Sequence, residues 1–415
     1  MQWSVEVTPC GMDSRGNMNS YRNSDPRPPI MTGSPSSMIV PPLDWDRGPW
    51  NRWAFQHVRE ILPTVEVWRG NGHRGRFARK ECDLDMLAVE TSRGDVATLA
   101  GLLDETYTDG FLVLKEGAIA YERYFNGMTE RTLHLSQSMA KSVTGTLAGI
   151  LIGRGLMDPA AKVTAYLPEL EQTGWDSASL QQVLDMTTGV KFSEAYTDRY
   201  SEIGQVDVAS GWKPVPPGSD PAFEWPRHMW ELVLRLKQTT RPHGAAFEYR
   251  SIETDVIALA MERVTGKRLA ELVSEEIWQK IGAEENASFT VDPAGYALAD
   301  AGFSATLRDY GRFGQMILEQ GAGIVPSEWI NATRSGKHSA DFHPSLPRGS
   351  YRNQFWIMDP DSRTLMCKGV FGQFIIIDFE HSMVAVKLSS YPDFTNDAYS
   401  IATYRAVQAI ALELT

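Results

Sequence analysis

The spacing of apolar residues changes along the chain, and the changes predict strands near both ends with helices between them. Residues 111–125 (FLVLKEGAIAYERYF) hold two apolar runs joined by Lys115-Glu116-Gly117, which is typical of a β-hairpin with glycine in its turn. Three later segments have similar strand-like runs: NQFWIM at 353–358, GQFIIIDF at 372–379 and MVAVKLSS at 383–390. Strands from the front of the chain are therefore expected to pair with strands from its last third.

Helical spacing is typical of the middle of the chain. Residues 138–158 (SMAKSVTGTLAGILIGRGLMD) repeat apolar side chains with the period of one helix face, and Gly153 and Gly155 are expected to end this helix. Further helices are predicted over 261–282 and at the C-terminus over 398–414. The fold class that follows is α/β, an antiparallel sheet flanked by helices with an inserted all-helical lobe.

The same pattern gives provisional boundaries. Residues 1–45 are rich in Pro, Ser, Asn and Gly and are predicted to form a polar N-terminal extension. The remainder, 46–415, is predicted to be one domain. Its α/β body spans about 46–140 and 285–415, and its helical lobe spans about 141–284.

Charge and composition narrow the choice of partners and location. The net charge of −12 repels phosphate backbones, which argues against nucleic acid. No run of 18 apolar residues exists, so no membrane span is expected, and the N-terminus lacks the pattern of a secretory leader. The few cysteines are far apart, as in proteins with free thiols, which predicts a cytoplasmic location: Cys10, Cys82 and Cys367.

The pattern Ser-x-x-Lys occurs twice, at Ser138…Lys141 and at Ser210…Lys213. About one such match is expected by chance in a chain of this length, so context has to separate them. Ser210 precedes a proline-rich loop, whereas Ser138 begins the apolar helix. Residues three apart on a helix share one face, so the Lys141 amine can reach the Ser138 hydroxyl. An ordinary helix-capping serine followed by a solvated lysine is the alternative interpretation.

Such a pair has a known chemical use. A serine hydroxyl becomes a good nucleophile only when a base accepts its proton. Lysine can be that base if burial lowers its pKa, and the apolar helix predicts such burial for Lys141. A tyrosine placed by the fold could then carry a proton to the leaving group.

Several segments together resemble the serine β-lactamase and penicillin-binding-protein superfamily, most closely its class C-like branch of carboxylesterases and 6-aminohexanoate-dimer hydrolases. The resemblance covers roughly residues 45–415 in the family's order. Its main motifs are SMAKSVTGTLAGILIGRGLMD at 138–158, YLPEL at 166–170, VLDMTTGVKFSEAY at 183–196, AAFEYRSIETDVIALAMERVTG at 245–266 and GVFGQFIIID at 369–378.

The resemblance implies a Ser-Lys-Tyr catalytic centre. Ser138 would form an acyl-enzyme, Lys141 would accept its proton or keep Tyr249 basic, and Tyr249 would carry protons between nucleophile, leaving group and water. Without the motif, Tyr249 would be interpreted as a core aromatic residue. The oxyanion hole would use the backbone N–H groups of Ser138 and Val370. Substrate contacts are implied for Tyr196, Ser251 and Phe371.

The chain also departs from the family pattern. Tyr-x-Asn becomes Tyr249-Arg250-Ser251, and the Lys-Thr-Gly strand reads Cys367-Lys368-Gly369, with Phe371 where the nylon-oligomer hydrolases have a histidine. The Glu-x-x-Leu-Asn segment of class A enzymes does not occur. These differences argue against recognition of a β-lactam carboxylate.

The predicted function is therefore a serine hydrolase that cleaves small linear amides or esters. A β-lactamase or D-Ala-D-Ala peptidase is the first alternative, and an inactive scaffold that serves as a binding protein is the second. No cofactor or metal is expected, because the histidines form no ligand-like motif and the GxGxxG match at 70–75 precedes a charged segment. The predicted partner is a small-molecule substrate, and the oligomeric state is left open, with a homodimer as one alternative.

Overall fold

The computed structural model describes residues 27–28, 31, 33–339, 343–359, 361 and 364–415. Its main sheet is antiparallel except for one edge strand, β2, which runs parallel to β6. From edge to edge its strands are β10 (His338–Ser339), β11 (Ser350–Arg352), β12 (Phe355–Ile357), β13 (Leu365–Gly369), β14 (Gln373–Asp378), β15 (Met383–Ser389), β5 (Thr108–Lys115), β6 (Ala118–Tyr124) and β2 (Ala78–Arg79).

Strands from the N-terminal and C-terminal parts of the chain pair within this sheet, as the apolar pattern predicted. Strand β15 pairs with β5, with Val384 opposite Leu114. The predicted hairpin forms between β5 and β6, and its two turn residues Glu116 and Gly117 have φ of 52° and 74°. Positive φ at both positions is the geometry that suits the twist of a two-residue hairpin, and glycine adopts it without strain.

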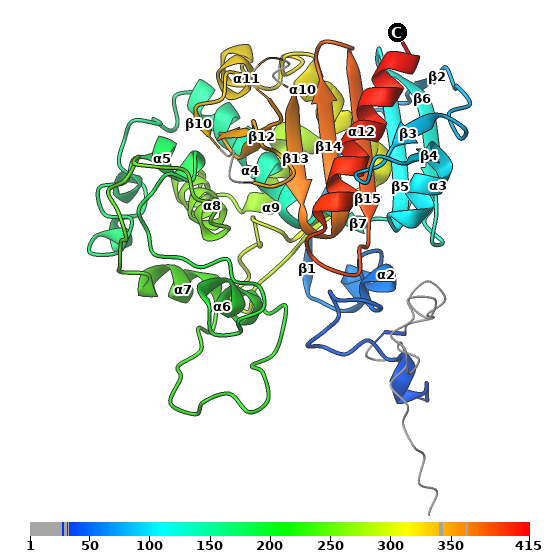
Figure 1. The fold of residues 1–415 in the computed structure, drawn as a ribbon. Coiled ribbons are helices and arrows are strands. Elements are labelled where there is room, and N and C mark those ends of the chain that lie inside the picture. Colours follow the sequence, from blue (N-terminus) through cyan, green and yellow to red (C-terminus); the bar gives the residue numbers. More distant parts are fainter. Residues whose placement is uncertain (1–26, 29–30, 32, 340–342, 360, 362–363) are drawn as a thin grey trace, which may run out of the picture.

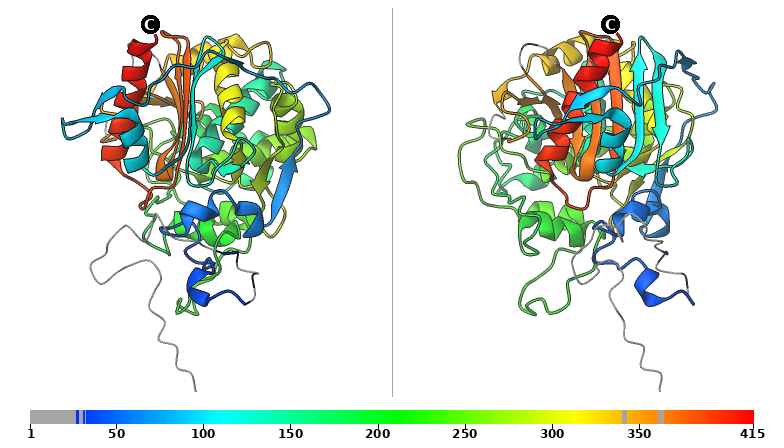
Figure 2. Two further views of the ribbon diagram at one scale, coloured as in Figure 1. Left: turned by 90° about the vertical axis from the view of Figure 1, so that its right-hand side faces the viewer. Right: turned by 45° about the vertical axis from the view of Figure 1, so that its right-hand side comes forward.

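Helices cover both faces of the sheet. The C-terminal helix α12 (Asp397–Glu413) lies on one face together with α3 (Leu99–Glu105), and α10 (Leu307–Leu318) lies on the other (Figures 1 and 2). Tyr404 of α12 packs edge-on against Phe374 at 5.6 Å. Helix α10 approaches closely because it carries Gly311, where a Cβ would lie 2.6 Å from Leu112.

The predicted helical lobe lies beside the β10 end of the sheet (Figure 1). Its helices are α5 (Leu180–Leu184), α6 (Glu202–Ala209), α7 (Met229–Arg235), α8 (Ile252–Thr265) and α9 (Leu269–Val273), followed by a π-helical turn over Ser274–Trp278. The helix predicted over 138–158 consists of a 3₁₀ turn, η3 (Gln137–Met139), followed by α4 (Ala140–Gly153). Helix α4 packs against α8 and runs between lobe and sheet.

The remaining elements connect these layers. A smaller sheet contains β1 (Thr64–Val67), β8 (Ala287–Thr290), β9 (Phe303–Ala305) and β7 (His134–Leu135), and a separate hairpin contains β3 (Ala88–Glu90) and β4 (Val96–Thr98). Two further helices are α2 (Asn51–Ala54) and α11 (Ser327–Arg334). Among the described residues, no helix is long and apolar enough to cross a bilayer.

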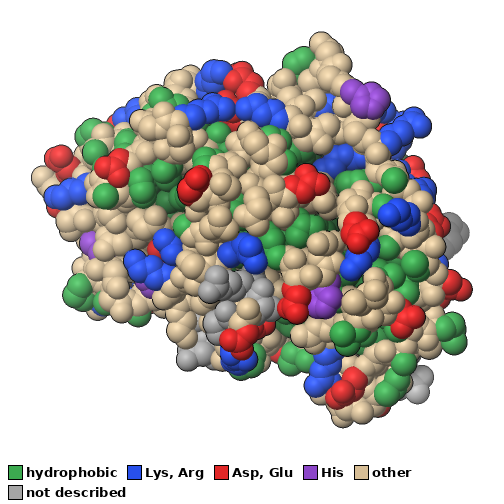
Figure 3. Space-filling model, turned by 90° about the horizontal axis from the view of Figure 1, so that it is seen from above, with side chains coloured by type: hydrophobic (Ala, Val, Ile, Leu, Met, Phe, Trp, Pro, Cys, Tyr) green, Lys and Arg blue, Asp and Glu red, His purple; other side chains and the backbone are tan. Residues whose placement is uncertain are grey.

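The segment before α2 contributes to the core. Val40 and Trp45 are fully buried, and the Trp45 indole N–H donates a 2.8 Å hydrogen bond to the carbonyl of Trp212 in the lobe. The boundary placed at residue 46 stays a prediction. On the face seen in Figure 3, acidic and basic side chains of the described residues are interspersed, with apolar side chains between them.

Candidate active site

Ser138 lies where a short strand turns into a helix. Strand β7 ends at Leu135, η3 carries Ser138, and α4 begins two residues later. Lys141 is in the first turn of α4, and its Nζ lies 3.1 Å from Ser138 Oγ. The expectation that these two side chains share one face is therefore confirmed. Free backbone N–H groups and the helix dipole at this terminus favour negative charge developing at Ser138.

Lys141 is buried, with 1% of its surface exposed. Its Nζ donates to the carbonyl of Asp300 at 2.8 Å and lies 3.5 Å from the Asp300 carboxylate. Burial acts to lower the Lys141 pKa, but the electrostatic interactions with Tyr249, Asp300 and Glu194 outweigh it and raise the pKa above its ordinary value. The prediction of a lowered lysine pKa was wrong, because acids from distant segments surround the amine.

Tyr249 reaches the same point from the loop before α8. Lys141 Nζ lies 5.3 Å from the centre of the Tyr249 ring, and Tyr249 lines the same cavity as Ser138. The ring stacks on Trp356 at 5.7 Å, which fixes its orientation. Burial raises the pKa of Tyr249, and the charge of Lys141 opposes that effect. The three residues predicted to act together therefore lie close to one another.

Three acids near this centre were missed by the sequence reasoning. Asp300 holds Lys141 as described above. Asp255 on α8 accepts a 3.0 Å hydrogen bond from the backbone N–H of Ala299, and burial beside Asp300 raises its pKa. Glu194 accepts hydrogen bonds from Ser251 and, at 2.7 Å, from the Tyr196 hydroxyl. Glu194 and Asp255 lie inside quoted motifs, but their types and spacing gave no signal of a role.

The backbone around Val370 approaches the nucleophile closely. A Cβ on Gly369 would lie 2.6 Å from the carbonyl of Ser136, so only glycine allows β13 to come this near. The backbone N–H of Phe371, the residue after Val370, donates to the carbonyl of Phe394 at 2.9 Å. It is therefore not available to a substrate. Val370 lines the cavity together with Ser138. An oxyanion hole made by the Ser138 and Val370 N–H groups stays a prediction.

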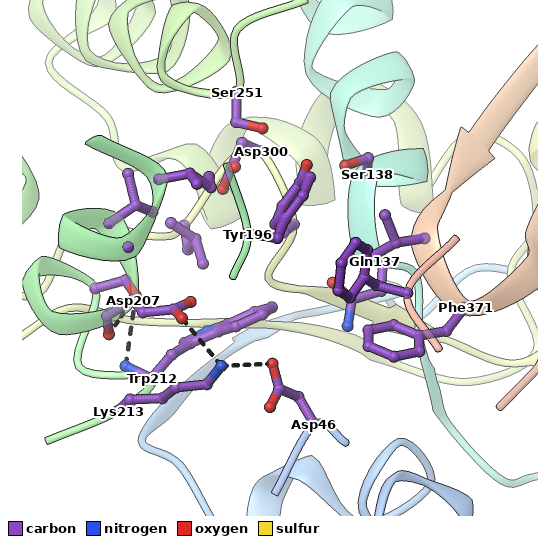
Figure 4. A pocket seen from close by; sticks show the side chains of 18 of the residues that line it. Asp46, Gln137, Ser138, Tyr196, Asp207, Trp212, Lys213, Ser251, Asp300 and Phe371 are labelled. Carbon is purple, nitrogen blue, oxygen red and sulfur yellow. Dashed lines mark hydrogen bonds and ion pairs between the residues drawn. The ribbon is translucent and has the colours of Figure 1, made fainter. Parts of the chain in front are cut away.

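The cavity at Ser138 has two branches. Ser138, Tyr196, Val370 and Phe394 line both of them. The first branch (Figure 4) is also lined by Asp46, Gln137, Asp207, Trp212, Lys213, Ser251 and Phe371. The second is also lined by Tyr249, His343, Trp356, Lys368, Asn396 and Asp397. All three residues implied as substrate contacts therefore face the cavity, although their contact with a substrate stays a prediction.

Charged groups close the far end of the first branch. Lys213 Nζ lies 2.8 Å from Asp46 and 3.0 Å from Asp207, so one cation pairs with two carboxylates (Figure 4). The Ser210 hydroxyl donates to the backbone carbonyl of Asp207 instead of contacting Lys213. The second Ser-x-x-Lys match is therefore an ion-pair site and not a nucleophile with its base.

The second branch carries a cation of a different kind. Lys368 Nζ lies 2.6 Å from His343 Nε2 and 5.6 Å from the centre of the Trp356 ring. Burial lowers the pKa of Lys368 to about 8 and that of His343 to about 4. His343 is thus neutral near pH 7 and can accept a hydrogen bond from the ammonium. Among the residues that the structure describes, no carboxylate lies within 4.0 Å of Lys368 Nζ.

Two histidines of the chain, His134 and His243, have structural contacts. His134 is buried with its Nε2 3.1 Å from Asp109, and His243 Nδ1 accepts the backbone N–H of Gly189 at 2.9 Å. Within the described part of the chain, no group of three or more His, Cys, Asp or Glu side chains could hold a metal ion.

Comparison with known proteins identifies the family. The family model described as Beta-lactamase matches residues 98–410. The chain is 36% identical over 365 residues to 6-aminohexanoate-dimer hydrolase of Paenarthrobacter ureafaciens, over 85% of this chain and 89% of the relative. A Bacillus anthracis structure assigned as a 6-aminohexanoate-dimer hydrolase has a TM-score of 0.83 and 31% identity, over 92% of this chain and 98% of that one.

A more distant structure shares the fold. EstCE1, a hydrolase with promiscuous acyltransferase activity, has a TM-score of 0.60 at 15% identity, over 74% of this chain and 98% of that one. The predicted superfamily and fold class are thus confirmed. The chain belongs to the β-lactamase family.

Proposed function

We propose that this protein is a serine hydrolase that cleaves small linear amides or esters through an acyl-enzyme on Ser138, with Lys141 and Tyr249 as its catalytic partners. The observation that carries the proposal is the proximity of these residues: Lys141 Nζ is 3.1 Å from Ser138 Oγ and 5.3 Å from the centre of the Tyr249 ring. A nucleophile, a proton carrier and a fixed positive charge are what acyl transfer requires.

The raised pKa of Lys141 supports a division of roles. An amine whose pKa is raised is a poor acceptor for the serine proton, so we assign Tyr249 as the proton carrier and Lys141 as the positive charge beside it. As Ser138 Oγ bonds to the carbonyl carbon, its proton passes to the Tyr249 oxygen while the Tyr249 proton passes to the leaving nitrogen or oxygen. In deacylation, water gives a proton to Tyr249, and Tyr249 returns one to Ser138 Oγ. The Lys141 ammonium stabilises negative charge on the phenol oxygen in both steps.

The cavity suggests how a substrate lies. Tyr249 lines only the second branch, so the leaving group that it protonates occupies that branch and the acyl part occupies the first. Among the described residues no carboxylate lies within 4.0 Å of Lys368 Nζ, so this cation favours a leaving group that carries an anion. A linear amide of 6-aminohexanoate, the compound in the name of the 36% identical relative, releases an amine that bears a carboxylate. This class of substrate fits the second branch.

A substrate panel tests the proposal. Wild type and Ser138→Ala are assayed with p-nitrophenyl esters, 6-aminohexanoate dimer and β-lactams. We expect ester and linear-amide hydrolysis by the wild type and its loss in the variant, with the fold unchanged by circular dichroism. Hydrolysis retained by Ser138→Ala contradicts the proposal. Turnover of β-lactams well above that of esters supports a β-lactamase instead, and no hydrolysis at all supports a binding protein.

Location and assembly belong to the same proposal. Cys82 and Cys367 are free thiols in the structure, in keeping with the cytoplasmic location predicted from the sequence. Fractionation of the native host, followed by immunoblotting, would test this location. Sedimentation of the purified protein would decide between monomer and homodimer.

A further inference from the structure

Buried polar atoms without partners gather in the first branch of the cavity. Within the described residues, Asp46 Oδ1, Gln137 Nε2 and Asp300 Oδ1 are buried, form no hydrogen bond and belong to side chains that line this branch. Most buried polar groups in folded proteins are hydrogen-bonded, because an unpaired group loses its interaction with water and gains nothing in return. Unpaired polar atoms on the wall of one cavity are available to bind a ligand.

Gln137 differs from the other two in what it can bind. Carboxylate oxygens accept hydrogen bonds, whereas the amide nitrogen of Gln137 donates them. Lys213, a cation that also lines this branch, is paired with two carboxylates. Gln137 therefore offers an unpaired side-chain donor in a branch where unpaired acceptors prevail.

The backbone holds Gln137 in place beside the nucleophile. Its φ of 49° lies in the left-handed region, which is uncommon for residues other than glycine and recurs at functional sites. Its Cβ packs against β13, since a Cβ on Gly369 would approach it to 3.1 Å. Only 4% of Gln137 is exposed. Figure 4 shows its side chain next to Ser138, on the wall between the nucleophile and Phe371.

We propose that Gln137 is a substrate-binding residue that selects acyl chains carrying a hydrogen-bond acceptor, such as an in-chain amide carbonyl. The inference rests on the proposed function, because it places the acyl part of the substrate in the first branch, opposite the Tyr249 branch. It adds a chemical requirement: the acyl chain is not purely hydrocarbon. An acyl chain that contains a further amide group, as in a longer oligo-amide or an acylamino acid, meets this requirement.

Matched esters test this selection. A series of p-nitrophenyl esters of equal chain length is prepared, one all-carbon and the others with a single amide carbonyl moved along the chain. The common leaving group makes kcat/KM report the acylation step. We expect the wild type to prefer at least one amide-containing ester over the all-carbon ester by about tenfold, as one hydrogen bond in a dry site provides.

The variant Gln137→Met keeps the length of the side chain and removes the donor. We expect it to lose the preference, to within about twofold. Gln172→Met is the matched control, because Gln172 also has a positive φ, 64°, but is exposed. If Gln137→Met fails to fold, Gln137→Gly removes the side chain at a φ that glycine tolerates.

Two outcomes overturn the inference: no preference in the wild type, or an equal preference in wild type and Gln137→Met. Either result leaves the proposed function untouched as long as the all-carbon ester is hydrolysed and Ser138→Ala abolishes that hydrolysis. Activity retained by Ser138→Ala would instead refute the proposed function itself. The two failures are therefore distinguishable in one set of assays.

Discussion

Lys141 owes its protonation state to residues that are far away in the sequence. Asp300 and Glu194 come from separate loops, and Tyr249 comes from the segment before α8. The spacing of Ser138 and Lys141 predicts their contact, because a single helical turn connects them. It cannot predict the charge on the amine, which is set by tertiary neighbours that carry no motif. For that reason the contact between Ser138 and Lys141 was predictable from the sequence and the direction of the Lys141 pKa shift was not.

The role of Tyr249 as proton carrier predicts a difference between substrates. Tyr249→Phe should lower kcat/KM for a linear amide by about 10²–10⁴-fold, the usual effect of losing a general acid. A p-nitrophenyl ester should be affected less, because nitrophenolate leaves without protonation. Tyr200→Phe, at an exposed tyrosine, serves as the control. Equal losses for both substrates would contradict the assignment of Tyr249 as the acid for the leaving group.

Lys368 should give substrate binding a pH dependence. Because burial lowers its pKa to about 8, the ammonium is present below that pH and is lost as the pH rises through it. The KM of a carboxylate-bearing amide should therefore rise above pH 8, whereas the KM of a neutral ester should not. Lys368→Met should raise the amide KM about tenfold at pH 7 and remove its pH dependence. A KM that is flat from pH 7 to 9.5 in the wild type would refute this.

Helix α4 shows what sequence periodicity predicts about an element and what it omits. Its apolar spacing predicted the helix, and Gly153 was correctly placed at its end. The pattern did not show that Gly145, Gly149 and Gly153 form one face against which other elements pack. A Cβ at these positions would lie 2.6 Å from the Asn353 carbonyl, 2.5 Å from the Trp329 ring and 2.3 Å from Pro326, respectively.

This close packing predicts the sign of a stability change. Alanine in place of glycine normally stabilises a helix interior by about 1 kcal/mol. Gly149→Ala should instead lower the free energy of unfolding, by about 1–3 kcal/mol, because the added methyl group displaces the buried Trp329 ring. Urea unfolding of the two proteins measures the difference. A variant as stable as the wild type, or more stable, would show that α4 does not need this contact.

At the scale of the whole molecule, the sheet and the inserted helical lobe were predictable, because strand-like patterns lie near both ends of the chain and helical patterns lie between them. The contribution of the N-terminal segment to the core was harder to predict, because its composition is polar although Trp45 is buried. Trp45 joins this segment to the helical lobe through Trp212, with ring centres 5.1 Å apart. Asp46, the next residue, then reaches the end of the cavity through Lys213.

The N-terminal segment is therefore expected to stabilise the lobe and shape the site together. Trp45→Ala should lower the free energy of unfolding by about 3–5 kcal/mol and reduce activity on long acyl chains. Trp68→Ala is the matched control, since 44% of Trp68 is exposed. Urea unfolding and chain-length profiles of ester hydrolysis provide the measurements. If the Trp45→Ala protein is as stable as the wild type, this segment does not contribute to the stability of the core.

Covalent labelling tests the central claim, that Ser138 is the nucleophile, most directly. The wild type is treated with a fluorophosphonate, and peptide mass spectrometry locates the modified residue. We expect one adduct, on the peptide that contains Ser138, absent from Ser138→Ala and formed far more slowly by Tyr249→Phe. An adduct on Ser210 or another serine, or no adduct on a folded protein that hydrolyses esters, would contradict the account.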